Sequence, residues 1–273
     1  MRTLVHLSDL HFGRVDQALI EPLTSLIKRI APDVVVVSGD LTQRAKSGQF
    51  RAARAFLETL PEPRIVVPGN HDISLHNLYH RFLRPLAKYR KYVTDELEPI
   101  YADEEIAVLG INTARSLTFK DGRVNRDQLE RLRTRLTALE HDCTKIIVTH
   151  HPFDLPQHFG PHHLVDRAPQ AMDLFSQCGV DLLLAGHFHS SHAGHTGERY
   201  KISGYAALMV QAGTATSTRG RGETNSFNVI RVAQDRITVE RHSWVPAGGV
   251  FTLAGSDTFK RSAKVWINAT ASS

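Results

Sequence analysis

The sequence has few cysteines, few aromatic residues and no long apolar run. Among 273 residues only two are cysteine, Cys143 and Cys178, and 7% are aromatic. Two cysteines are too few for a disulfide framework or a thiolate zinc site, so we expect two small buried thiols in a reducing compartment. No stretch approaches the roughly 20 apolar residues of a membrane-spanning helix. The sequence therefore predicts neither a disulfide-stapled protein nor a membrane span.

Neither sign of charge dominates the chain. Lys and Arg number 33 against 28 Asp and Glu, a formal net charge of +5. A mildly basic surface suits an anionic substrate such as a phosphate, but this excess is ordinary for the length, and we expect no stable nucleic-acid complex. We expect no secretory signal at the N-terminus, because the apolar run from Thr3 to Leu7 is short and is followed at once by Asp9 and His11. We expect a cytoplasmic protein.

Short β-branched runs alternate with segments of helical periodicity, which predicts a layered α/β domain. The strand candidates are Thr3–Leu7, Val34–Val37, Ile65–Val67, Ile106–Ile111, Lys145–Thr149 and Asp181–Ala185. The helical candidates are Leu19–Ile30, Phe50–Leu60, Leu75–Leu86 and Leu129–Leu139. Because 41% of its residues are hydrophobic, the chain has enough apolar residues for one sizeable core.

After Gly204 the pattern changes to consecutive strands without helices between them. This predicts an antiparallel portion that closes the fold. We divide the chain into a catalytic domain over residues 1–247 and a poorly specified tail over 248–273, with one strand near Val265–Ile267. The tail is a candidate cover for the site or contact in a homodimer.

Sixteen histidines are the most unusual feature, and several follow strand candidates. Five blocks place polar side chains there: Asp9-Leu10-His11, Gly39-Asp40, Gly69-Asn70-His71-Asp72, His150-His151 and Gly186-His187-Phe188-His189. Ligands in open α/β sheets bind at the carboxyl ends of strands, so these side chains are expected to converge on one edge. Carboxylate, amide and imidazole groups are ligands of divalent cations.

The spacing within the blocks favours metal binding. Asp9 and His11 are alternate residues, which point the same way in extended backbone, and His187 and His189 repeat this arrangement. Asp40 follows a glycine, at a turn from which its carboxylate can reach between two ions. The remaining ligand candidates are Asn70, which adds an oxygen without charge, and His150.

The five blocks closely resemble the signature of the calcineurin-like metallophosphoesterases, which is DxH, GD, GNH[DE], H and GHxH in that order. The resemblance extends over about residues 3–190. It implies a four-layer αββα sandwich of two mixed β-sheets flanked by helices. It also implies two divalent ions, Mn, Fe or Zn. One ion would be held by Asp9, His11, Asp40 and His189, and the other by Asp40, Asn70, His150 and His187, with Asp40 as the bridge.

The resemblance further implies a dinuclear phosphodiesterase in which hydroxide held between the ions attacks phosphorus. His71 would stay off the metals and donate a proton to the leaving oxygen, and Asp72 would orient its imidazole. The versions of the second and third blocks look most like bacterial class III cyclic-nucleotide phosphodiesterases. From the resemblance to that branch, we expect the substrate to be a small phosphoester, with cyclic AMP as the leading candidate.

Three alternatives stay open. The chain resembles enzymes that cleave the pyrophosphate of UDP-diacylglucosamine, and a phosphomonoesterase or protein phosphatase shares the same ligands. A non-catalytic binding scaffold is the third, although every ligand of the pattern is retained here. The branch that acts on DNA ends carries large extra domains, which 273 residues cannot house.

Other polar residues near the blocks have either a substrate-binding role or a solvated, structural one. His151 is expected to pack against the site or orient His150 instead of ligating. The residues left with both interpretations are His158, His162, His163, His192, His195, Arg14, Arg219 and Arg221. Arg219 and Arg221 lie in a turn that is able to return to the site.

Overall fold

The computed structural model describes residues 1–269 apart from 75–82, 116–120, 140–141, 157–158, 220–221 and 264. The strands of the described residues form two sheets. The first has the order β13-β12-β11-β10-β1-β2-β3, with bounds β1 Arg2–Leu7, β2 Val34–Ser38, β3 Arg64–Val67, β10 Ser226–Ala233, β11 Arg236–Val245, β12 Val250–Ser262 and β13 Val265–Asn268. The second has the order β4-β5-β6-β7-β9-β8, with bounds β4 Ile100–Ala102, β5 Ile106–Gly110, β6 Thr144–Val148, β7 Leu182–Ala185, β8 His192–His195 and β9 Leu208–Gln211.

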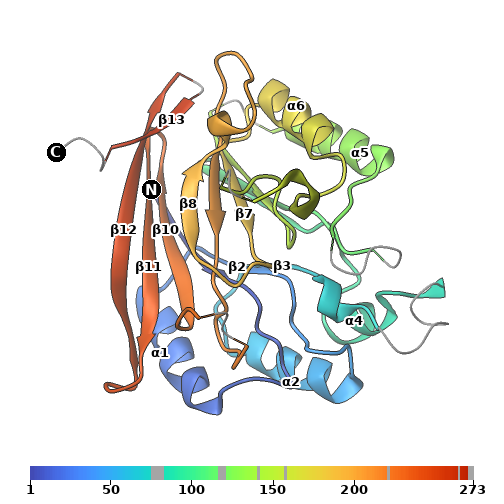
Figure 1. The fold of residues 1–273 in the computed structure, drawn as a ribbon, viewed down its shortest axis with the longest axis vertical. Coiled ribbons are helices and arrows are strands. Elements are labelled where there is room, and N and C mark those ends of the chain that lie inside the picture. The colour runs from blue at the N-terminus through green and yellow to red at the C-terminus, as the bar shows by residue number, and fades with distance from the viewer. Residues whose placement is uncertain are drawn as a thin grey trace.

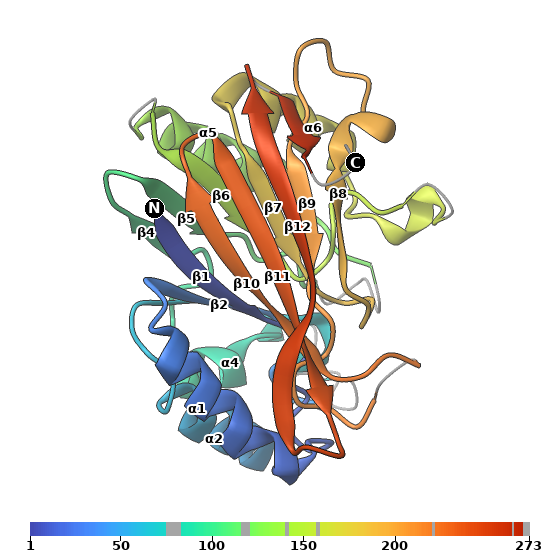
Figure 2. The same ribbon diagram turned by 90° about the vertical axis from the view of Figure 1, so that its left-hand side faces the viewer.

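Helices cover the outer faces of both sheets. The described helices are α1 Ile20–Ile30, α2 Ser47–Leu57, α4 Ala87–Tyr92, α5 Arg126–Thr137 and α6 Ala168–Cys178, with short 3-10 turns such as η2 Asn70–Asp72. Figure 1 shows α1 and α2 together at the bottom of the view and α5 and α6 at the upper right, and Figure 2 shows the same separation from the side. The strands lie between these two pairs of helices.

Alternate residues of the central strands pack into different apolar layers. In β2, Val35 and Val37 pack with α1 and α2, whereas Val34 and Val36 face the second sheet and pack with residues such as Ile146 of β6. A third cluster joins the outer face of the second sheet to α5 and α6. Burial on both faces explains why β2 is an unbroken apolar run. The expected four-layer αββα sandwich is confirmed.

The C-terminal part is more regular than expected. Residues 250–262 form β12, which pairs antiparallel with β11 along the register from Arg236↔Lys260 to Val245↔Val250. The prediction of a poorly specified tail is therefore wrong for these residues, while the expected strand near Val265 exists as β13. The misleading signal is composition, because β12 contains Gly255 and several small polar residues that have low strand propensity. Pairing with β11 overrides it.

The ends of two sheets, and not one edge, carry the site. The parallel strands β1, β2 and β3 belong to the first sheet, and the parallel strands β5, β6 and β7 belong to the second. The loops after β1, β2 and β3 contain the first three blocks, and those after β6 and β7 contain the last two. The blocks therefore meet where the carboxyl ends of both sheets come together.

The segment 75–86 and helix α6 are the two places where helices were predicted and described differently. The expected helix Leu75–Leu86 lies for the most part outside the described residues, and α4 begins just after it. Helix α6 was not predicted, although it begins with a proline within its first turn and ends at Gly179 in the left-handed conformation. None of the helices in the described part of the chain has the length and apolar character needed to cross a membrane.

Candidate metal centre

The backbone at the five blocks is unusual. Five of the seven proposed ligands have positive φ: Asp9 (53°), His11 (49°), Asp40 (52°), His187 (75°) and His189 (59°). The expectation that Asp9 and His11 continue an extended strand is wrong, since both lie in left-handed turns. Such conformations cost about 1–3 kcal/mol each in non-glycine residues and are held by their surroundings. Here the His11 N–H donates to the Asp40 carbonyl at 2.9 Å and fixes the turn.

A first group of donor atoms surrounds one point. His11 Nε2 lies 3.4 Å from Asp9 Oδ1, and His189 Nε2 lies 3.2 Å from the same oxygen. The two Nε2 atoms are 3.3 Å apart. Asp40 Oδ2 completes this group at 3.7 Å from His11 Nε2. All four side chains are at most 3% exposed.

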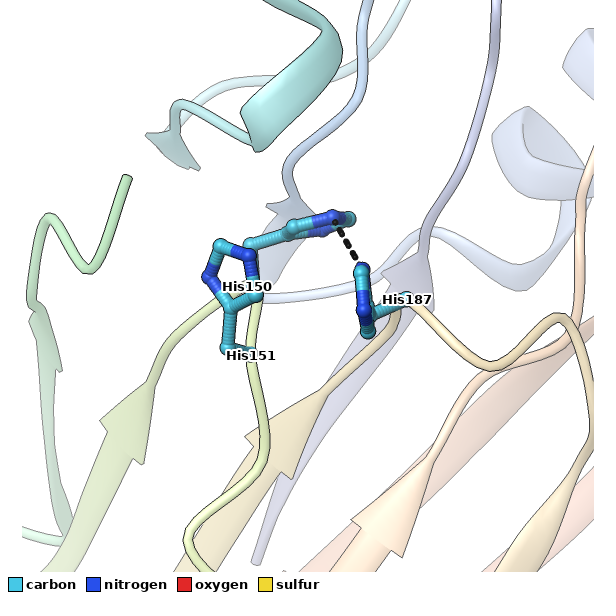
Figure 3. A group of neighbouring side chains, drawn as sticks. All are labelled: His150, His151 and His187. Carbon is cyan, nitrogen blue, oxygen red and sulfur yellow. Dashed lines mark hydrogen bonds between the residues drawn. The ribbon is translucent and has the colours of Figure 1, made fainter. Parts of the chain in front are cut away.

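A second group shares the Asp40 oxygen. His150 Nε2 lies 3.4 Å from Asp40 Oδ2, 3.1 Å from Asn70 Oδ1 and 3.3 Å from His187 Nδ1. Figure 3 shows the His150 and His187 rings reaching toward each other from the ends of neighbouring strands. Asp40 Oδ2 is thus the atom common to both groups.

These separations fit two cation sites. Donors that bind one ion at about 2.0–2.2 Å lie about 3.0–3.5 Å from one another around a tetrahedral or octahedral centre. Asp9 Oδ1 adds an independent indication, because it is buried and, within the described part of the chain, has no donor in hydrogen-bonding geometry. A buried carboxylate oxygen without a donor is costly unless a cation neutralises it. The residues present therefore fit two divalent ions.

Electrostatics agree with this geometry. Burial alone raises the pKa of a carboxyl, yet the surrounding histidines hold the pKa values of Asp9 and Asp40 well below their usual range. Burial opposes the charge on His150, but Asp40 and Asp9 raise its pKa to about 9. A proton on His150 thus helps to balance the carboxylates when no cation is bound, and a cation that binds His150 must displace it.

Backbone carbonyls orient two of the imidazoles. His150 Nδ1 donates to the Ser38 carbonyl at 2.9 Å, and His189 Nδ1 donates to the Arg219 carbonyl at 3.1 Å. Each bond keeps a proton on Nδ1, so Nε2 is the atom that would bind a cation through its lone pair. Sequence reasoning missed Ser38 and the Arg219 carbonyl, because a backbone acceptor leaves no mark in the side-chain pattern.

Glycines allow the blocks to approach closely. A Cβ at Gly69 would lie 2.1 Å from Asp40 Oδ1, and one at Gly186 would lie 1.8 Å from Ser8 Oγ and 2.6 Å from Asp9 Oδ2. Neither position tolerates a side chain without movement of a proposed ligand. The glycines of the third and fifth blocks are therefore required by space.

His71 lies beside both groups. Its Nδ1 donates to the Gln43 carbonyl at 2.8 Å, which directs Nε2 toward Arg219 Nη1 at 3.2 Å. Its ring stands edge-on to His11 with centroids 4.9 Å apart. Burial lowers the pKa of His71, although Asp40 partly offsets this effect. The imidazole is therefore neutral in the protein without ions.

Asp72 has different partners from those expected. Its carboxylate accepts hydrogen bonds from the backbone N–H groups of Leu41, Thr42 and Gly69 at 2.9–3.1 Å and from the Thr42 hydroxyl. It does not contact the His71 ring, whose orienting partner is the Gln43 carbonyl. Asp72 instead ties the second block to the third. Burial and the nearby Asp40 raise the pKa of Asp72 to about 6.

His151 packs against the centre, as expected. Its Nδ1 lies 2.8 Å from the Thr113 hydroxyl, and its ring centroid lies 4.7 Å from that of His187. Figure 3 shows it beside the pair formed by His150 and His187. Burial lowers the pKa of His151 well below the usual value, so the ring is neutral.

The other candidates divide by distance from the centre. Arg219 reaches His71, and His163 lies edge-on to Phe188, with centroids 5.6 Å apart. The His162 ring packs against His163 at a tilt of 46°, with centroids 4.0 Å apart, whereas His192 and His195 lie exposed at the two ends of β8. The side chain of Arg14 is exposed. His158 and Arg221 lie outside the described residues.

The sequence pattern of the calcineurin-like phosphoesterases matches residues 2–191, which include all five blocks. The chain belongs to this family. Calcineurin-like phosphoesterases are hydrolases of phosphoesters, and the Asp/His groups of this member indicate that it binds divalent metal.

Individual relatives agree with the family. This phosphoesterase is 27% identical over 280 residues to a cAMP/cGMP dual specificity phosphodiesterase of Mycobacterium tuberculosis, covering 92% of this chain and 81% of that one. Its fold is similar to that of a dimetal phosphatase from Danio rerio, with a TM-score of 0.66 at 14% identity over 89% of this chain and 96% of that chain. It is also similar to a purple acid phosphatase from yellow lupin, with a TM-score of 0.70 at 14% identity. The match covers 96% of this phosphoesterase but about half, 54%, of the lupin chain.

Proposed function

We propose that this phosphoesterase is a dinuclear phosphodiesterase that hydrolyses a small cyclic nucleotide. The observation that carries the proposal is the position of Asp40 Oδ2, 3.7 Å from His11 Nε2 and 3.4 Å from His150 Nε2. Asp40 would therefore belong to two ligand sets, each of which would hold one divalent ion. The donor set of imidazole, carboxylate and amide suits Mn, Fe or Zn.

The ligands divide as the family pattern implies. Asp9, His11 and His189 would hold one ion together with Asp40. Asn70, His150 and His187 would hold the second ion, again with Asp40. When bound, the pair of cations neutralises charge on the phosphoryl oxygens and supplies hydroxide at neutral pH.

His71 is the proposed proton donor to the leaving oxygen. The Gln43 carbonyl accepts the hydrogen bond of the Nδ1 proton, so Nε2 is unprotonated in the neutral ring; it first takes up a proton from solvent and then passes it to the leaving oxygen. An alkoxide leaving group, such as the ribose oxygen of a cyclic nucleotide, needs this proton far more than a nitrophenolate does. Asp72 acts as a positioning residue, because its bonds to Leu41, Thr42 and Gly69 fix the blocks on either side of His71.

Two observations favour a nucleotide over other phosphoesters. The relative from Mycobacterium tuberculosis is named for cAMP and cGMP. In addition, Phe159, His163 and Phe188 form a half-buried aromatic group, and Phe188 lies edge-on to His187 with centroids 5.2 Å apart. An aromatic wall beside the metal ligands offers a nucleobase a surface on which to pack.

A substrate panel tests the proposal. Protein stripped of metal is loaded with Mn²⁺, and turnover is compared on cyclic AMP, bis-nitrophenyl phosphate, nitrophenyl phosphate and a UDP-linked lipid sugar. We expect turnover of both diesters and little turnover of the monoester. Monoester turnover far above diester turnover would make the protein a phosphatase, and turnover of the lipid substrate alone would make it a pyrophosphatase. Phe188→Ala should raise the KM for cyclic AMP and leave that for bis-nitrophenyl phosphate unchanged.

A further inference from the structure

The loop formed by residues 212–219 is fastened onto the first block. The Thr214 hydroxyl donates to the Asp9 carbonyl at 2.7 Å, and the Thr216 hydroxyl donates to the Leu10 carbonyl at 2.8 Å. Both threonines are at most 1% exposed. Hydrogen bonds between residues more than 200 positions apart fix the loop against the backbone that carries Asp9 and His11.

This anchoring places Arg219 at the centre. Its carbonyl accepts the hydrogen bond from His189 Nδ1, and its N–H donates to Ser217 Oγ at 3.1 Å. The backbone of Arg219 therefore touches one proposed ligand. Its guanidinium reaches in the other direction, where Nη1 lies 3.2 Å from His71 Nε2.

The guanidinium has no anionic partner in the described residues. Arg199 and Arg261, which are also half-buried, pair with Asp154 and Asp181 respectively. By contrast, no carboxylate of the described chain lies within ion-pair distance of Arg219. The Nη1 contact to a neutral imidazole occupies one of five N–H donors and leaves the positive charge unbalanced.

We propose that Arg219 binds a non-bridging oxygen of the substrate phosphoryl group. The inference rests on the proposed function and adds a residue that recognises the anionic phosphoryl group beside the metal ligands. Guanidinium groups bind phosphoryl oxygens with two parallel hydrogen bonds, and the charge on those oxygens is spread over the group during transfer. On this account His71 and Arg219 act side by side: Arg219 holds the phosphoryl group and His71 serves the leaving oxygen.

The test uses the Mn²⁺-loaded full chain with Arg219→Ala and Arg219→Lys. Arg126→Ala is the matched control, because Arg126 is an exposed arginine at the start of α5. Two quantities are measured besides metal content: binding of inorganic phosphate by calorimetry, and kcat and KM on bis-nitrophenyl phosphate. Inorganic phosphate is the probe because it carries only the chemistry that Arg219 is proposed to recognise.

We expect Arg219→Ala to keep both metal ions, to weaken phosphate binding at least about tenfold and to lower kcat/KM about 10²-fold, the loss typical of one transition-state donor. Arg219→Lys should recover part of the phosphate affinity, since it restores the charge but not the paired donors. Arg126→Ala should match the wild type in all three measurements.

Two results would overturn the inference. One is phosphate affinity and turnover within twofold of wild type in Arg219→Ala. The other is loss of manganese from both Arg219 variants, which would assign the side chain a structural role. Failure of the proposed function has a different signature: the wild-type protein itself would hydrolyse none of the esters in the panel.

Discussion

Gly69→Ala tests the packing of the centre at one atom. The backbone of Gly69 is extended, with φ of −107° and ψ of −178°, so an alanine adopts it without conformational strain. The added methyl group would lie 2.1 Å from Asp40 Oδ1 and 2.3 Å from Asp40 N, where contacts below 3.0 Å essentially do not occur. Residue 69 or the bridging aspartate must therefore move by about 1 Å.

The size of the effect follows from that movement. Overpacking of this kind costs about 1–3 kcal/mol of unfolding free energy. A shift of about 1 Å in a group that positions the reaction costs about 10²-fold in rate. We therefore expect Gly69→Ala to lose about 1–3 kcal/mol of stability in the metal-free state, to bind manganese more weakly and to fall about 10²-fold in kcat/KM on bis-nitrophenyl phosphate.

Gly48→Ala is the control for a glycine-to-alanine change. Gly48 lies within α2, and a Cβ there meets nothing closer than Arg51 Nη2 at 3.9 Å. This variant should gain about 0.5–1 kcal/mol of stability and keep full activity. The assay combines urea unfolding, metal titration and turnover. A Gly69→Ala protein that binds two manganese ions with wild-type affinity and turns over within threefold of wild type would refute the reasoning.

Three further predictions concern the histidines. His71→Gln should keep its manganese and lose about 10²–10⁴-fold in turnover of cyclic AMP but much less on bis-nitrophenyl phosphate, whose leaving group needs no proton; equal losses on the two substrates would argue against an acid role. Adding Mn²⁺ to the stripped protein at pH 7 should release protons, because the pKa of His150 is raised to about 9. The apparent affinity for Mn²⁺ should therefore fall about tenfold for each pH unit below about 9 and each proton displaced. Calorimetry in buffers of different ionisation enthalpy measures this release, and its absence would contradict the prediction. Burial lowers the pKa of His6 to about 3. The unfolded chain therefore takes up a proton at His6 below about pH 6.5, whereas the folded protein does so only near pH 3. The contribution of His6 to the free energy of unfolding is complete above about pH 6.5 and falls by up to about 1.4 kcal/mol per pH unit below it. Urea unfolding of metal-free wild type and His6→Asn between pH 6 and 4.5 should show the steeper decline in the wild type, and parallel slopes would contradict the assignment.

Several strands and the types of the proposed ligands could be predicted from the sequence, because both depend on local residue patterns. Apolar runs such as Val34–Val37 predict strands that are buried on both faces, and the turn that follows carries a polar residue, Asp40. The residue types at those turns predict a site for divalent cations, and the resemblance of their order to the calcineurin-like signature implies a two-metal phosphoesterase. The same locality explains the failures. Gly255 and Asp257 interrupt the strand propensity of residues 250–262, yet pairing with β11 makes the whole segment β12.

The tertiary structure alone decided which side chains meet and what each one does. Asp9 and His189 lie 180 positions apart, yet Asp9 Oδ1 and His189 Nε2 are 3.2 Å from each other because the two sheets bring their carboxyl ends together. The partners of Asp72 and the position of Arg219 depend on backbone atoms from distant loops, which no side-chain pattern records. Sequence thus determined the ligand types, since these depend on residue chemistry, whereas the geometry of the centre depends on how separate segments pack.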